Sequence, residues 1–182
     1  LQRVPIVVNP RDCVPKDYIR NNIKDNMKLI PKDKFIEKCR THTDHAIIIS
    51  GGPNMDYKKL KETLDKHPKA FTMCVKHAYP GLIANDIKPD ACILLDPRSI
   101  EGESTHGVKR KDLLKDLDKD TKFLVASMTD PSVTNYLIEK KADIWGWHAF
   151  TESLRDDEDR KHAIKNNQVK IREDVGLPVG AT

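Results

Sequence analysis

The chain has 182 residues, enough for a single domain whose core buries roughly two-thirds of the unfolded surface. Lys and Arg outnumber Asp and Glu by 32 to 28, but the charges are interspersed, so we do not expect a nucleic-acid partner. No apolar run approaches the roughly 20 residues of a membrane helix, and we expect a cytoplasmic protein whose four cysteines stay reduced.

The first 45 residues are expected to form a short lead-in to the main domain. Residues 1–15 contain several prolines and are expected to be extended. Apolar residues then recur at helical spacing from Tyr18 to Ile30, which predicts a helix, and a second short helix is predicted over Lys32–Arg40. This division leaves residues 46–182 for the main domain.

Five apolar runs alternate with helical patterns in the rest of the chain. Strands that alternate with helices imply a parallel sheet with right-handed crossovers, so we expect an α/β fold with a mostly parallel sheet. The predicted strands are Ala46–Ile49, Ala70–Val75, Ala91–Leu95, Phe123–Ala126 and Ile144–Trp147, and the predicted helices are Tyr57–Lys66, Ala78–Asn85, Lys111–Leu117 and Ser132–Lys141.

The first predicted strand ends in a glycine turn. Gly51 and Gly52 admit backbone angles closed to other residues and let a ligand approach the main chain, and Asp56 is placed to cap the next helix. Amides at the carboxyl end of a parallel strand suit a phosphate. An ordinary capped turn is the alternative. The candidate nucleotide-binding residues are Ser50, Gly51, Gly52, Pro53, Asn54 and Asp56.

Asp96 directly follows the predicted strand Ala91–Leu95. In a doubly wound sheet this edge is the ligand crevice, so we expect Asp96 to share a space with the glycine turn. There it is a candidate to hold Mg²⁺, a ribose hydroxyl or a substrate proton. The alternative is that Asp96 only caps its own turn through Arg98 and Ser99.

Two further groups of side chains follow predicted strands. Lys76 and His77 come directly after the second strand and are expected to place a charge and a titratable group beside a bound phosphate. Trp145 and Trp147 precede His148, a candidate acid or base, and their rings suit stacking on a flat base. Solvation of the first pair and core packing of the aromatic residues are the alternatives.

Other motifs are incomplete or missing. Cys39, His42 and His45 are spaced as metal ligands can be, but no second Cys or His pair completes a zinc site. The chain has no Walker Gly-Lys-Ser/Thr ending, and the glycine turn lacks Gly-x-Gly-x-x-Gly spacing, which disfavours a nicotinamide dehydrogenase. The polar segment from Thr151 to Asp174 is expected to be a solvated insertion or lid.

Three motifs, taken in order, resemble those of a known family. Ala46–Asp56 is an apolar strand with a glycine turn, Ile87–Asp90 reads Ile-Lys-Pro-Asp, and Leu95–Pro97 closes a strand in Asp-Pro. Together they resemble the 6-hydroxymethylpterin diphosphokinase MptE-like family, which also includes a domain of motility accessory factor (Maf) proteins. Family members carry a later Gly-Gly-Ser-Val-Ala-Thr type turn, which Val179–Thr182 resembles, so we expect a C-terminally truncated domain. The first motif is also similar to the nucleotide-binding turn of bacterial sialyltransferases.

The resemblance implies a Rossmann-like three-layer fold and a transferase that binds a nucleoside phosphate. For archaeal members it implies magnesium-assisted transfer of diphosphate from ATP to a pterin alcohol, and for the Maf relatives transfer of sugar from a nucleotide sugar. It assigns Gly52, Pro53, Asn54, Asp56 and Gly180 to the nucleotide, and Asp96 to the metal or nucleotide. A glycosyltransferase with His148 as base and a non-catalytic nucleotide-binding module are alternatives, and the acceptor and oligomeric state are left open.

Overall fold

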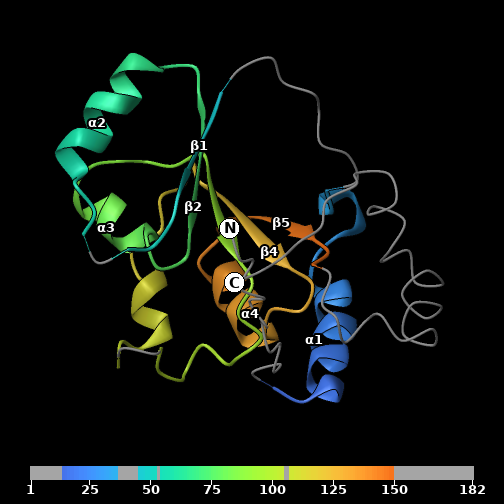
Figure 1. Ribbon diagram of the computed structural model, residues 1–182. Coiled ribbons are helices and arrows are strands. Elements are labelled where there is room, and N and C mark those ends of the chain that lie inside the picture. The colour runs from blue at the N-terminus through green and yellow to red at the C-terminus, as the bar shows by residue number, and fades with distance from the viewer. Residues whose placement is uncertain (1–13, 37–44, 53, 105–106, 150–182) are drawn as a thin grey trace, which may run out of the picture.

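A computed structural model describes residues 14–36, 45–52, 54–104 and 107–149 of the protein (Figure 1). An open sheet of five strands forms its centre, and every neighbouring pair of strands is parallel. The α/β fold expected from the sequence is therefore confirmed, and the open parallel sheet is consistent with a Rossmann-like fold. The strands are β1 (Ala46–Ile49), β2 (Phe71–Val75), β3 (Ala91–Leu94), β4 (Lys122–Ala126) and β5 (Asp143–Trp147).

A helical element connects each strand to the next. Two further elements, α1 (Lys16–Leu29) and the short 3₁₀ helix η1 (Lys32–Lys34), precede the sheet. No helix in the described ranges is long and apolar enough to cross a bilayer. In chain order the connecting elements are α2 (Tyr57–Lys66), α3 (Tyr79–Ala84), the 3₁₀ helix η2 (Arg110–Leu114) and α4 (Pro131–Glu139).

Two helix starts are fixed by aspartate caps. The Asp56 carboxylate accepts a hydrogen bond from the Lys59 amide at 3.0 Å and so caps α2. The Asp130 carboxylate accepts one from the Ser132 amide at 2.9 Å and caps α4, which begins with Pro131. An aspartate cap satisfies an amide that has no partner within the helix, and proline suits the first turn because it has no amide hydrogen. The cap by Asp56 is expected from the sequence and is confirmed. An acidic residue directly before a proline, as in Asp130-Pro131, is likewise a pattern typical of a helix start.

The core lies against one face of the sheet. Residues that are level with one another in neighbouring parallel strands share a face, and Ile49, Cys74, Cys92 and Phe123 are level in this way. All four are buried in one apolar cluster with Leu82 of α3. Burial of a large aliphatic or aromatic side chain contributes about 1.5–3 kcal/mol, so this cluster is a main source of the sheet's stability.

The described strands follow one another across the sheet in the same order as in the chain. Right-handed crossovers between strands in that order place successive helices on the same face. Ile48 and Phe71, whose side chains lie on the other face, are exposed. The strand order does not reverse within these five strands, so the kind of crevice that forms at such a reversal does not arise between them. The expectation that Asp96 shares a space with the glycine turn stays a prediction.

The segment after α1 departs from prediction. The helix expected over Lys32–Arg40 is reduced in the described residues to η1, and Phe35 instead forms a parallel bridge with Gly146 of β5. The Ile36 amide donates to the Gly146 carbonyl at 2.9 Å. A Cβ on Gly146 would lie 2.6–2.8 Å from ring atoms of Phe35, so the close approach of the ring requires glycine.

Helix α1 is fixed to the carboxyl end of β4 and to α4, beside which it lies in Figure 1. The buried Asn26 amide donates to the carbonyls of Ser127 and Thr129, and its oxygen accepts a hydrogen bond from the Thr134 hydroxyl at 2.6 Å. A buried amide with these partners fixes the orientation of a helix because leaving any of them unpaired is costly. α1 thereby helps position the loop that follows β4.

Candidate functional site

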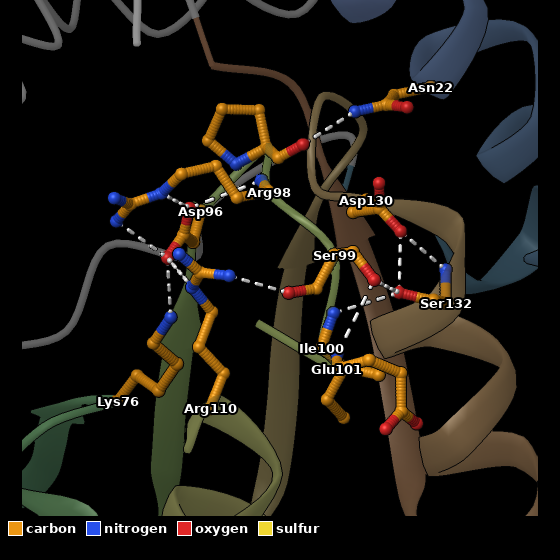
Figure 2. Close-up of polar contacts among 11 residues, drawn as sticks. Asn22, Lys76, Asp96, Arg98, Ser99, Ile100, Glu101, Arg110, Asp130 and Ser132 are labelled. Atoms are coloured by element: carbon orange, nitrogen blue, oxygen red, sulfur yellow. Dashed lines mark hydrogen bonds and ion pairs between the residues drawn. The ribbon is translucent and has the colours of Figure 1, made fainter. Parts of the chain in front are cut away.

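The Asp96 carboxylate lies at the carboxyl edge of the sheet and is surrounded by basic side chains (Figure 2). Its Oδ2 accepts a hydrogen bond from Lys76 Nζ at 2.9 Å. Its Oδ1 accepts from the Arg98 amide at 3.1 Å, and the Arg98 guanidinium binds both oxygens, with Nε at 2.8 Å from Oδ1 and Nη2 at 3.0 Å from Oδ2. Lys76 and Asp96 are thus brought together as predicted, because they follow adjacent parallel strands.

Arg110 adds a third cation from η2. Its Nη1 donates to the Ser99 carbonyl at 2.8 Å, and its Nε lies 3.4 Å from Asp96 Oδ2. Gly102 packs against this guanidinium so closely that a Cβ there would collide with Nη1. Arg110 Nε is buried and has no hydrogen-bond partner within the described residues. A buried donor without a partner is uncommon in native proteins and calls for an explanation.

The cluster of Lys76, Asp96, Arg98 and Arg110 is mostly buried. The side chains of Lys76 and Arg110 are each 9 % exposed and that of Asp96 12 %, whereas Arg98 is 37 % exposed and connects the cluster to solvent. Burial acts to raise the pKa of Asp96, but hydrogen bonds from Arg98 and Lys76 outweigh it and hold the pKa well below its usual range. Three cations therefore contact one ionised carboxylate.

A second carboxylate, Asp130, ends the loop after β4. Its Oδ1 accepts hydrogen bonds from the Ser132 amide and hydroxyl, and its Oδ2 accepts one from the Tyr18 hydroxyl at 2.6 Å. The Asp130 amide also donates to the Asp96 carbonyl at 3.2 Å, which joins the two loops. The hydrogen bond to Asp130 is the main reason that the pKa of Tyr18 is raised. Both oxygens of Asp130 thus already have protein donors.

The glycine turn after β1 lies against the end of β2. A Cβ on Gly51 would be 3.0 Å from the Cβ of His77, whereas a Cβ on Gly52 would have nothing within 4 Å. Neither glycine has a positive φ, so the expectation that they take angles closed to other residues is wrong. Gly51 is explained by its close approach to His77, but nothing inside the described protein accounts for Gly52. Ser50 and the turn glycines are exposed.

Other predicted nucleotide-binding residues have different positions. Asn54 is exposed, and Asp56 is engaged as the cap of α2. His77 is exposed beside Gly51, while Lys76 turns inward to Asp96. Pro53 and Gly180 lie outside the described residues, as do Cys39, His42 and the predicted lid over residues 151–174.

His148 lies at the end of β5, in contact with Ser127 and Phe35. Its Nδ1 is 2.9 Å from Ser127 Oγ, and its ring stacks on Phe35 with centroids 4.9 Å apart. Burial lowers the pKa of His148 to about 4, so the imidazole is neutral at pH 7 and a weak base. Trp145 and Trp147 each use their indole nitrogen in a hydrogen bond, to Asp143 and to the Leu124 carbonyl.

The residues at Asp96 do not fit a magnesium ion held by the protein in this arrangement. Mg²⁺ needs anionic or neutral oxygen ligands in near-octahedral geometry. Both oxygens of Asp96 already accept hydrogen bonds from cations, and both oxygens of Asp130 have donors of their own. No group of three or more His, Cys, Asp or Glu side chains suited to a metal occurs in the described ranges. Asp96 is therefore a poor magnesium ligand in this arrangement, and the expected use of magnesium by the protein stays a prediction.

Arg98 and Arg110 are not identified as binding residues by the sequence analysis. Arg98 is considered there only as part of the Asp96 turn, and its backbone amide does donate to Asp96. A basic residue directly after an Asp-Pro strand end is the signal that was available for Arg98. Arg110 has no such signal, because it lies fourteen positions after Asp96 and reaches the site through a loop.

One family model matches the chain. The model of the family described as 6-hydroxymethylpterin diphosphokinase MptE-like matches residues 18–175, which includes every strand of the sheet and the whole cluster around Asp96. No curated protein and no solved structure matches the chain. The family suggested by the three sequence motifs is the family found, and the chain belongs to the 6-hydroxymethylpterin diphosphokinase MptE-like family.

Proposed function

We propose that the protein is a nucleotide-dependent transferase that moves diphosphate from ATP to an alcohol acceptor of the 6-hydroxymethylpterin type. Family membership supports the reaction class. The observation that carries the proposal is the gathering of Lys76, Arg98 and Arg110 around Asp96. The exposed glycine turn lies against His77, the residue after Lys76, and has free space at Gly52. Cations beside accessible main chain are what a polyphosphate requires.

In the proposed reaction the acceptor hydroxyl oxygen forms a bond to the β-phosphorus of ATP. The bond between that phosphorus and the oxygen of the α-phosphate breaks, AMP leaves, and the hydroxyl proton passes to water. Catalysis of such transfers consists mainly of positioning and of stabilising the charge on phosphoryl oxygens. Lys76, Arg98 and Arg110 are the side chains proposed to stabilise that charge. No step is assigned to magnesium, because both oxygens of Asp96 already accept hydrogen bonds from basic side chains.

Glycosyl transfer with His148 as general base is less well supported. A general base works best when its pKa is near the operating pH, whereas burial lowers the pKa of His148 to about 4. Its contacts with Ser127 and Phe35 indicate a structural role at the end of β5. The other alternative is a module that binds a nucleotide without turnover.

The proposal is tested with purified protein, ATP, magnesium and 6-hydroxymethylpterin. Formation of AMP together with the pterin diphosphate is expected, and both products are quantified by liquid chromatography. Nucleotide binding without AMP formation would favour the non-catalytic module. A thermal-shift panel of ATP, GTP, CMP and nucleotide sugars, with and without magnesium, identifies the nucleotide, since a ligand that binds only the folded state raises its apparent stability.

Gly52→Ala tests where the nucleotide lies. The added methyl group meets nothing within 4 Å, so the unfolding midpoint without ligand should not change. If phosphates approach the main chain here, the methyl group should weaken nucleotide binding by about tenfold, which corresponds to about 1.4 kcal/mol. Lys58→Ala, on the exposed surface of α2, serves as the control. Unchanged nucleotide affinity in Gly52→Ala would exclude the turn from the site.

A further inference from the structure

Two histidines lie close together at the amino edge of the sheet, the edge opposite to Asp96. His45 directly precedes β1, and His67 ends α2 shortly before β2 begins. Their rings have centroids 5.7 Å apart and planes inclined by 57°. Both residues are exposed, so a small ligand can reach both rings from solvent.

The backbone holds both histidines against the same short segment of chain. The His45 carbonyl accepts a hydrogen bond from the Phe71 amide at 3.0 Å, and the His67 carbonyl accepts one from the Ala70 amide at 2.9 Å. The His67 amide also donates to the Leu64 carbonyl at 2.9 Å, which ties it to the last turn of α2. Because both backbone positions are fixed, a ligand that bridges the two rings has only side chains to order.

The ring nitrogens of both histidines are available to a ligand. Within the described residues, the side chains of His45 and His67 contact each other but form no hydrogen bond or ion pair. Imidazole is the commonest metal ligand in proteins, through either ring nitrogen. Zn²⁺ lies about 2.0–2.1 Å from such a nitrogen, and two rings that share one tetrahedral ion have centres about 5–6 Å apart. The observed separation of 5.7 Å suits such an ion.

We propose that His45 and His67 together bind one divalent transition-metal ion such as Zn²⁺, at a site separate from the nucleotide. Imidazole favours Zn²⁺, Ni²⁺ and Cu²⁺, whereas Mg²⁺ prefers oxygen ligands. No third His, Cys, Asp or Glu joins the pair within the described ranges, so water completes the coordination. The bound ion joins the start of β1, the end strand of the described sheet, to the turn before β2 and stabilises this edge.

The first test measures Zn²⁺ binding to the full chain by calorimetry, after removal of metal with EDTA and with the cysteines kept reduced. The wild type should bind with micromolar affinity. His45→Gln and His67→Gln should each weaken binding by at least about tenfold, because each removes one of two protein ligands. His77→Gln is the matched control, because it removes an exposed histidine at the opposite edge of the sheet.

The second test separates loss of a ligand from damage to the fold. Both histidines are exposed, so the unfolding midpoints of His45→Gln and His67→Gln in EDTA should equal that of the wild type. Zn²⁺ should raise the midpoint of the wild type and of His77→Gln, but not those of His45→Gln and His67→Gln. His67→Cys replaces one zinc ligand by another and should keep the Zn²⁺-dependent rise.

The contrary outcomes are specific to a shared ion. Zn²⁺ affinity that falls in only one of His45→Gln and His67→Gln would show that the rings do not share an ion and would overturn the site. Wild-type binding that appears only at millimolar Zn²⁺ would reveal adventitious binding and would also overturn it. An equal loss in the His77→Gln control would assign the binding to exposed histidines in general and reject the pair.

Discussion

Replacement of Asp96 by asparagine is expected to destabilise the fold by about 3 kcal/mol. Removal of one partner from a buried ion pair typically costs about 3–5 kcal/mol, because a buried charge is left uncompensated. Lys76 and Arg110 meet this description with 9 % exposure each, whereas Arg98 is 37 % exposed and adds little because solvent screens it. The asparagine oxygen can still accept a hydrogen bond, which places the estimate at the lower end of the range.

Urea unfolding followed by tryptophan fluorescence measures this loss, with Trp145 and Trp147 of β5 as probes. With a slope of about 2 kcal/mol per molar urea, the unfolding midpoint should fall by roughly 1.5 M. Asp17→Asn is the control, because its pair with Arg20 is exposed and should contribute less than about 1 kcal/mol. If Asp96→Asn unfolds at the same urea concentration as this control, the cluster does not depend on Asp96 and the reasoning fails.

Three further variants test other parts of the structure. The pKa of His148 is about 4 in the folded chain and near 6.5 when unfolded, so the unfolded state takes up the proton first. The contribution of the neutral His148 imidazole to the free energy of unfolding is fully present above pH 6.5 and falls by about 3 kcal/mol as the pH drops to 4. Urea titrations should show a weaker pH dependence in His148→Gln but not in the exposed control His67→Gln. Gly146→Ala should lower stability by about 1–3 kcal/mol, because its Cβ would be 2.6–2.8 Å from the Phe35 ring; an unchanged midpoint would refute that contact. Asp130→Ala removes the cap of α4 together with the hydrogen bonds from the Ser132 and Tyr18 hydroxyls, so it should cost more than the about 1 kcal/mol of a cap alone in the same assay, and no loss would mean that these contacts are dispensable.

Most of the sheet could be predicted from the sequence. Each apolar run became a strand, because a strand of a parallel sheet is apolar over most of its length. The caps at Asp56 and Asp130 join residues that are two or three positions apart, so the sequence alone is enough to predict them. The helix expected over Lys111–Leu117 is instead the 3₁₀ helix η2, which begins at Arg110, the residue bound to Ser99.

The candidate site was predictable only where it depends on topology. Lys76 and Asp96 follow neighbouring strands, and a parallel sheet necessarily brings such ends together. The role of Arg110 could not be predicted, because it depends on the path of the loop between β3 and η2. Gly51 was singled out for the wrong reason: its importance lies in the approach of His77, a tertiary contact, and not in an unusual backbone angle.

The most direct test of the account is the rate of AMP formation from ATP and 6-hydroxymethylpterin, compared between the wild type, Arg110→Met and Lys111→Met. The account predicts turnover by the wild type, a loss of at least about tenfold in Arg110→Met, and an unchanged rate in Lys111→Met. Absence of AMP formation by the folded wild type, or equal rates in wild type and Arg110→Met, would contradict it.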